Sequence, residues 1–260
     1  MSDIQEGQSM NDINGAEDAQ RPADARDDEP AALANFIDKW RARWPEWNVA
    51  EVFVPAAQRP LVLAWATLQQ ELMDAAWGGT DPRPGVAKLG WWQEELAGWK
   101  RGARRHPLGT VLQAHPAPWE ALAAALPGLA DSRERPGDVR EAFASLEPFA
   151  QAVADIETIL FAGSASATDA HLVAATLLHA RFAQPGDGQV PLDMLARAGS
   201  GDPREAWARE LRKQWPTLPA GNRPRRLWAA LAARRLGQPD PVRPLSAWTT
   251  LRVAWRAARG

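Results

Sequence analysis

Apolar residues recur at the spacing of an α-helix along most of this chain, and no segment longer than a few residues has the alternating pattern of a β-strand. The helical pattern is clearest between residues 58 and 108, where two apolar stripes flank a Gly/Pro-rich loop. The first stripe is Leu61, Trp65, Leu68, Leu72 and Ala76, and the second is Leu89, Trp92, Leu96 and Trp99. Because apolar stripes are buried against other elements, we expect this helix pair to form the centre of an all-α protein.

The same periodicity predicts further helices on both sides of this pair. Their expected ranges are 30–44, 108–113, 118–126, 137–161, 169–182, 191–198, 203–215, 223–236 and 244–258, and residues 49–53 form a helical turn or an extended link. Proline-glycine at 127–128 is expected to end one helix, and Pro148 to kink the long one. Thr168 is a candidate N-cap, and residues 163–168 and 185–188 are expected to be a loop and a turn. Residues 1–29 are acidic and aperiodic, so we predict a disordered tail, followed by one domain over residues 30–260.

Composition excludes several classes of protein. The 260 residues include no cysteine, which rules out disulfides and thiolate chemistry, and no apolar run approaches the length needed to span a bilayer. The acidic N-terminus has the features of neither a secretory signal nor a mitochondrial transit peptide, so we expect a cytoplasmic protein. Fourteen tryptophans with no tyrosine point to a core packed with indole rings.

Three motifs resemble one known family. The first focal helix contains Leu-Gln-Gln-Glu-Leu at 68–72, and the second contains Lys-Leu-Gly-Trp-Trp-Gln-Glu-Glu-Leu at 88–96, followed by His-Pro-Leu at 106–108. A weaker match is Val-Pro-Leu-Asp-Met-Leu at 190–195. These motifs resemble the squalene/phytoene synthase family over roughly residues 60–199. They are most similar to its divergent branch, which includes mitochondrial complex I assembly factors.

The resemblance implies an isoprenoid-synthase bundle whose helices surround a central cavity. Active members bind isoprenyl diphosphates through Mg²⁺ held between two aspartate-rich motifs. Here the first motif is represented only by Glu71 and Asp74, which are the candidate catalytic and metal-binding residues. The helix at the second motif has no acidic residue after Asp169 and ends in Leu-His-Ala-Arg-Phe-Ala-Gln at 178–184. We therefore expect a catalytically degenerate member, a pseudoenzyme with no cofactor, and Mg²⁺ is required only if the chain is active.

Other polar residues are candidates for binding a ligand. Lys88 and Arg105, together with Arg104, could hold a phosphate, and Trp91 could flank an apolar chain. His179 lies where the resemblance implies diphosphate and Mg²⁺. The alternative is structural, with Lys88 paired to a carboxylate and Trp91 packed in the core.

The remaining charged and titratable residues have simpler interpretations. Glu94 and Glu95 are expected on a solvated face, and His106 and His115 in turns before prolines. Residues 1–31 carry a net charge of −7, and residues 201–260 carry +9. Arginines of the 223–236 helix could contact phosphates of a membrane surface or a partner, or form an ordinary solvated face: Arg223, Arg225, Arg226, Arg234 and Arg235.

These observations give one prediction of function and two alternatives. The prediction is an accessory or assembly protein that binds an isoprenoid or another lipid, or acts through a protein partner. The first alternative is an active prenyl transferase that uses an altered Mg²⁺ site on Glu71 and Asp74. The second is an interaction protein with a filled core. We expect no nucleic acid partner, and a location in the cytoplasm or peripherally at the inner membrane through the basic C-terminal helices.

Overall fold

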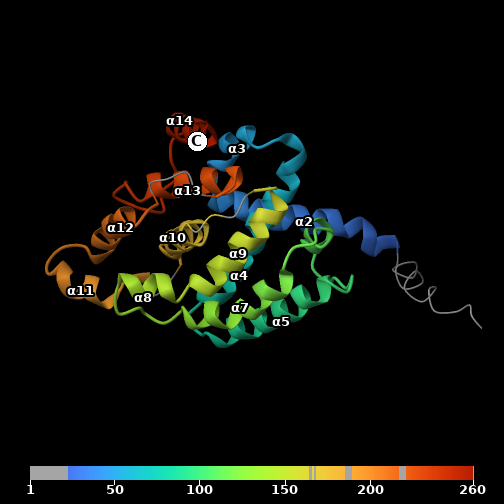
Figure 1. Ribbon diagram of the computed structural model, residues 1–260, viewed down its shortest axis with the longest axis horizontal. Coiled ribbons are helices and arrows are strands. Elements are labelled where there is room, and N and C mark those ends of the chain that lie inside the picture. The colour runs from blue at the N-terminus through green and yellow to red at the C-terminus, as the bar shows by residue number, and fades with distance from the viewer. Residues whose placement is uncertain (1–22, 164–165, 167, 185–188, 217–220, 260) are drawn as a thin grey trace, which may run out of the picture.

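The computed structural model describes residues 23–163, 166, 168–184, 189–216 and 221–259, and all regular elements in these ranges are helices (Figure 1). This confirms the all-α prediction. In chain order the helices are α2 (Ala23–Arg43), α3 (Trp47–Ala50), η1 (Glu51–Phe53), η2 (Ala56–Gln58), α4 (Arg59–Trp77), α5 (Arg83–Trp99), α6 (Gly109–Leu112), α7 (Trp119–Asp131), α8 (Val139–Ala144), α9 (Glu147–Leu160), α10 (Asp169–Arg181), α11 (Leu192–Ala198), α12 (Pro203–Lys213), α13 (Arg223–Arg235) and α14 (Ala247–Arg259). No helix among the described residues is long and apolar enough to cross a membrane.

Helix α4 forms the centre of the protein and is surrounded by neighbours. It contacts α2, α5, α6 and α7, and fifteen of its nineteen residues are buried. Pro60 lies in its first turn, where a missing N–H is tolerated, and Gly78 follows its last residue. Polar residues on a second face of the helix are partly buried: Thr67 and Gln70 are in the core, and Glu71 and Asp74 reach the surface.

Glycine allows α5 to lie very close to α4. A Cβ atom at Gly85 would be 2.1 Å from the carbonyl oxygen of Ala75, so only glycine fits at this crossing. The two helices that carry the family-like motifs are thus in direct backbone contact. Further extensive helix contacts are those of α5 with α7, α9 with α10 and α13 with α14, and α7 with α9 and α10 with α13 link these pairs.

Two predictions about proline were wrong. Helix α7 continues through Pro127 instead of ending there. The carbonyl of Ala123, four residues earlier, loses its helical donor and accepts a hydrogen bond from Gln93 Nε2 at 3.2 Å instead. The predicted 137–161 helix is two helices, because the chain breaks at residues 145–146 and Pro148 falls in the first turn of α9.

Other boundaries differ by smaller amounts. Helix α2 begins at Ala23, seven residues before Pro30, so it includes the last part of the predicted tail, and residues 1–22 lie outside the described residues. The 49–53 segment is helical, as one of its two alternatives proposed. Thr168 precedes α10 but its side chain makes no capping hydrogen bond. Residues 164, 165 and 167 of the predicted loop, and the predicted turn at 185–188, lie outside the described residues.

Candidate functional site

The candidate metal ligand Glu71 is paired with a cation of the same chain. Its Oε2 atom lies 2.6 Å from Nζ of Lys88, so the pair joins α4 to α5. Glu71 is mostly buried and the Lys88 side chain is 45% exposed. The contact corresponds to the structural alternative for Lys88, and it leaves the ammonium group accessible to solvent on one side.

Asp74, the second candidate ligand, is held by three donors. Its Oδ1 atom accepts hydrogen bonds from Arg43 at 3.0 Å, Gln70 at 2.9 Å and Gln184 at 2.6 Å. Gln184 follows α10, in the segment where the resemblance implies the second aspartate motif. The structure therefore brings this segment into contact with Asp74, through an amide and not a carboxylate.

This donor set does not suit Mg²⁺. A hard divalent cation requires several free oxygen ligands, whereas Glu71 and Asp74 each already hold a cationic side chain. No group of three or more His, Asp or Glu side chains that could hold a metal occurs among the described residues.

Next to the Glu71–Lys88 pair, aromatic rings enclose His106. The imidazole ring lies 4.5 Å from Phe36, 4.6 Å from Trp92 and 6.0 Å from Trp91, measured between ring centroids. We call these four residues the His106 cluster. Trp92 is fully buried, but Trp91 is only half-buried, so one indole of the cluster reaches the surface.

His106 is a neutral side chain at neutral pH. Burial lowers its pKa to about 4, and the nearby Lys88 lowers it too, while Glu71 and Glu95 oppose the shift. Its Nδ1 accepts a hydrogen bond from the backbone N–H of Leu108 at 3.1 Å, so the proton resides on Nε2. Positive charge at this surface therefore comes from lysine and arginine and not from the imidazole.

Glu95 organises the turn that carries these arginines, and the prediction that it lies on a solvated face was wrong. The carboxylate is buried and accepts hydrogen bonds from Trp99 Nε1, from the backbone N–H groups of Arg105 and His106, and from Arg105 Nε. Burial raises the pKa of Glu95, but these hydrogen bonds outweigh it and leave the pKa below its ordinary value. Glu94 is exposed, as predicted.

Arg105 lies over the half-buried indole of the cluster. Its guanidinium carbon is 5.0 Å from the centre of the Trp91 ring, and its Nη2 atom is 3.5 Å from Glu94. Lys88 precedes Trp91 by one helical turn on α5, so both lie on one side of that helix. The three residues proposed to bind a ligand from α5 and the following turn, Lys88, Trp91 and Arg105, are thus neighbours around His106.

His179 belongs to a different environment. It is completely enclosed, its Nε2 atom lies 3.0 Å from the carbonyl oxygen of Pro241, and its ring is 5.6 Å from Trp44. Burial lowers its pKa to about 3, and Arg235 adds to the shift. A neutral buried imidazole without solvent contact is not placed to bind a diphosphate, so the structure does not group His179 with the other candidates.

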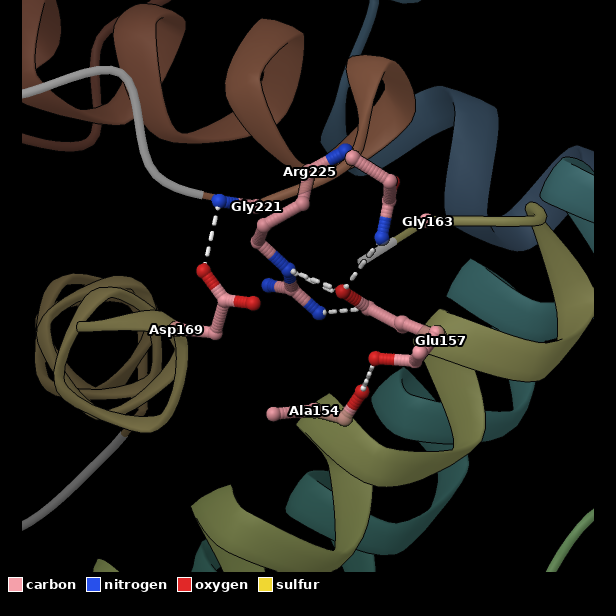
Figure 2. Close-up of a pocket in the computed structure, with 8 residues that line it drawn as sticks. Ala154, Glu157, Gly163, Asp169, Gly221 and Arg225 are labelled. Atoms are coloured by element: carbon pink, nitrogen blue, oxygen red, sulfur yellow. Dashed lines mark hydrogen bonds and ion pairs between the residues drawn. The ribbon is translucent and has the colours of Figure 1, made fainter. Parts of the chain in front are cut away.

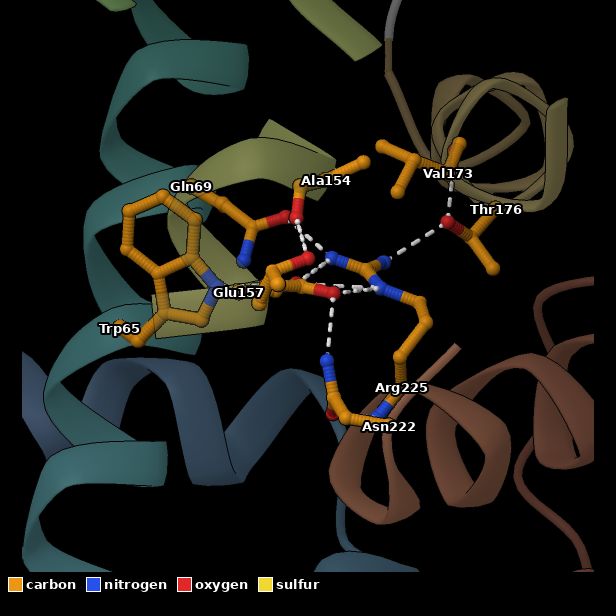
Figure 3. A network of polar contacts seen from close by, with 9 residues as sticks. Trp65, Gln69, Ala154, Glu157, Val173, Thr176, Asn222 and Arg225 are labelled. Atoms are coloured by element: carbon orange, nitrogen blue, oxygen red, sulfur yellow. Dashed lines mark hydrogen bonds and ion pairs between the residues drawn. The ribbon is translucent and has the colours of Figure 1, made fainter. Parts of the chain in front are cut away.

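The interior contains a polar network that the sequence did not lead us to expect (Figure 3). Arg225 of α13 is 1% exposed and forms an ion pair with Glu157 of α9. The same guanidinium donates to Thr176 of α10 at 2.9 Å and to Gln69 of α4 at 2.8 Å. Glu157 also accepts from Trp65 Nε1 at 2.9 Å. One arginine thereby connects four helices at the centre of the bundle.

A small cavity adjoins this network (Figure 2). Asp169 borders it on the side of α10 and accepts a hydrogen bond from the backbone N–H of Gly221 at 2.7 Å. The cavity has a volume of about 10 Å³, and so does a second one between Trp40, Trp65 and Trp228. A space of this size holds about one water molecule, so neither cavity can accommodate an isoprenoid chain.

The prediction that the arginines of 223–236 form a surface stripe was also wrong for two of them. Arg225 is buried as described, and Arg235 is buried in an ion pair with Glu46, with its guanidinium 4.1 Å from the Trp44 ring. Sequence spacing contained a signal for this, because Arg225, Trp228 and Arg235 fall on one helical face. Glu157 likewise lies among the apolar residues of α9. An arginine and a carboxylate that both lie on apolar helix faces indicate a buried ion pair.

Comparisons with known proteins do not identify a family. No family model, no curated protein and no solved structure matches this chain significantly.

Proposed function

We propose that this chain is an accessory protein with a degenerate squalene/phytoene synthase-like fold, and that it holds a phosphate-bearing lipid, such as an isoprenyl diphosphate, without condensing it. The observation that carries the proposal is the state of the two motif carboxylates. Glu71 is paired with Lys88, and Asp74 with Arg43, at 2.6 and 3.0 Å. A carboxylate that neutralises a cation of its own chain is a poor ligand for the Mg²⁺ of a prenyl transferase.

The proposed binding surface is the exposed edge of the His106 cluster. Lys88 and Arg105 retain donors that face solvent, and both are about half exposed. Lysine and arginine bind phosphate oxygens without a metal. The half-buried Trp91 beside them offers an apolar face to the first carbons of a lipid chain. On this surface the phosphate is the main recognition element, and the lipid chain contributes through contact with the indole.

Tryptophan fluorescence with a non-hydrolysable farnesyl diphosphate analogue tests the proposal. We expect binding that is independent of Mg²⁺ and is lost in a Lys88→Met/Arg105→Met variant. Two good phosphate contacts contribute about 3–6 kcal/mol, so the affinity should fall at least a hundredfold. The matched control is Lys100→Met/Arg101→Met, which removes one exposed lysine and one exposed arginine from the adjacent helix end.

Other outcomes separate the alternatives. Binding that requires Mg²⁺ and is abolished by Glu71→Ala would support the altered-metal prenyl transferase and overturn the accessory role. No binding of the analogue would favour an interaction protein with a filled core, an interpretation that the buried network around Arg225 also supports.

A further inference from the structure

Helix α14 reverses the usual distribution of large and small side chains. Ten of the fourteen tryptophans are buried and two are half-buried, but Trp248 and Trp255 of α14 are 77% and 47% exposed. The buried positions of this helix are occupied by Thr250 and Ala254. A helix that packs through small residues and exposes its indoles presents its main apolar surface to something outside the described fold.

The exposed face has a regular composition. Trp248, Arg252, Trp255 and Arg259 recur at intervals of four, three and four residues, which places them along one side of the helix. The Arg259 guanidinium carbon lies 4.4 Å from the centre of the Trp255 ring. Indole rings alternating with arginine are typical of surfaces that meet the interface of a bilayer, where the ring is amphipathic and the cation meets lipid phosphate.

The charged side chains on this face are all positive. No Asp or Glu occurs after Asp240, while four arginines do: Arg243, Arg252, Arg256 and Arg259. None of the four pairs with a carboxylate in the part of the chain that the structure describes. The acidic residues of the neighbouring elements are already engaged, since Glu51 of η1 pairs with Arg41 at 2.7 Å and Glu46 is buried with Arg235.

We propose that α14 docks this protein on an anionic membrane surface. Trp248 and Trp255 enter the headgroup region, and Arg252, Arg256 and Arg259 contact lipid phosphates. The proposal is independent of the binding site at Lys88 and Arg105, which lies on other helices.

Vesicle flotation with the full chain tests this docking surface. The vesicles contain phosphatidylcholine alone, or phosphatidylcholine with about a third phosphatidylglycerol, a content that gives a clearly negative surface. Neither contains a prenyl lipid, so failure of the proposed diphosphate site leaves this result unchanged. We expect strong binding to the anionic vesicles only, with a blue shift of tryptophan emission, and loss of binding in about 1 M salt, where screening acts within about 3 Å.

Substitutions on α14 and on α13 provide the matched comparison. Each arginine near an anionic surface contributes about 1 kcal/mol, so Arg252→Gln/Arg259→Gln should lower the partition coefficient about thirtyfold. The control Arg223→Gln/Arg234→Gln removes two exposed arginines of α13 and should bind as the wild type does. Trp248→Ser/Trp255→Ser should abolish the blue shift while the circular dichroism spectrum is unchanged, because both side chains are outside the core.

Three results would overturn the proposal. They are the absence of wild-type binding to anionic vesicles, equal binding to both kinds of vesicle, and equal loss in the α13 control. Absence of binding to anionic vesicles would favour an acidic protein segment as the ligand of the α14 face. Residues 1–31 of this chain, with their net charge of −7, are one such segment.

Discussion

Helices α13 and α14 are consecutive, arginine-rich and equal in length at thirteen residues, yet they use arginine in opposite ways. In α13, Arg225 and Arg235 point into the protein and each neutralises a buried carboxylate. In α14, Arg252 and Arg259 point outward beside exposed indoles. A desolvated guanidinium requires a partner, whereas a solvated one remains available to an external ligand.

The position of tryptophan indicates the role of arginine in this chain. Arg235 lies 4.1 Å from the ring of Trp44, which is buried, and Arg259 lies 4.4 Å from the ring of Trp255, which is exposed. The two cation–π contacts have similar geometry. Their energies differ because one pair is removed from water and the other is not.

The largest expected effect comes from removing the central guanidinium. Arg225→Met should lower the free energy of unfolding by about 3–5 kcal/mol, because Glu157 is left buried and unpaired. Arg252→Met on α14 is the control and should change stability by less than about 0.5 kcal/mol. Urea unfolding followed by circular dichroism measures both, and equal effects of the two substitutions would remove the distinction between the helices.

A conservative substitution tests whether burial strengthens the stacked arginine. Arg235→Lys keeps the charge but loses the planar contact with Trp44 and the two-pronged bond to Glu46, so we expect a loss of about 1–3 kcal/mol. Arg259→Lys should cost less than about 0.5 kcal/mol, because its stacking on Trp255 is exposed to solvent. Thermal unfolding of both variants measures the difference. Equal melting temperatures would show that burial does not strengthen the stacked arginine.

Acid is expected to destabilise the protein through two histidines. Burial lowers the pKa of His106 to about 4 and of His179 to about 3, against about 6.5 in an unfolded chain. Below about pH 6.5 the unfolded chain therefore binds more protons, and stability falls as the pH decreases towards 4. Each histidine contributes about 1.4 kcal/mol per pH unit in this window.

Urea titrations between about pH 7 and pH 5 measure this slope. His106→Gln should reduce it by about half, because one of the two imidazoles with a lowered pKa is removed. Helix α14 contains no histidine, aspartate or glutamate, so this slope does not arise from α14. A stability that is constant across the window would contradict the neutral, buried state of both histidines.

Helical periodicity predicted the fold class and most helices, because burial of one face leaves a direct trace in the sequence. Its errors arose where tertiary partners compensate for a local rule. Pro127 does not end α7 because Gln93, on another helix, satisfies the carbonyl it leaves free. The donor comes from a residue more than thirty positions away, so no local pattern could reveal it. The isoprenoid-synthase topology stays a prediction.

The candidate site was predicted in part. Lys88, Trp91 and Arg105 are adjacent in the fold, because they share a helix face and the turn that follows it. The burial of Glu95 was not predicted. Its carboxylate accepts hydrogen bonds from backbone N–H groups in a turn about ten residues later, and the sequence pattern of α5 does not reveal these donors. The surroundings of His179 depend on Pro241, sixty-two positions along the chain, and that separation lies beyond any motif.

The central guanidinium also constrains the order in which the protein can be built. Arg225 meets Gln69 across 156 positions of sequence, and Arg235 meets Glu46 across 189. During synthesis the amino-terminal helices emerge first, and Glu46 and Glu157 then have no counter-charge from α13. Closing such distant contacts is slow because loop entropy is lost before any contact compensates for it. The folded bundle is therefore completed only after the ribosome has released α13, and a chain truncated before that helix retains two carboxylates that it cannot bury.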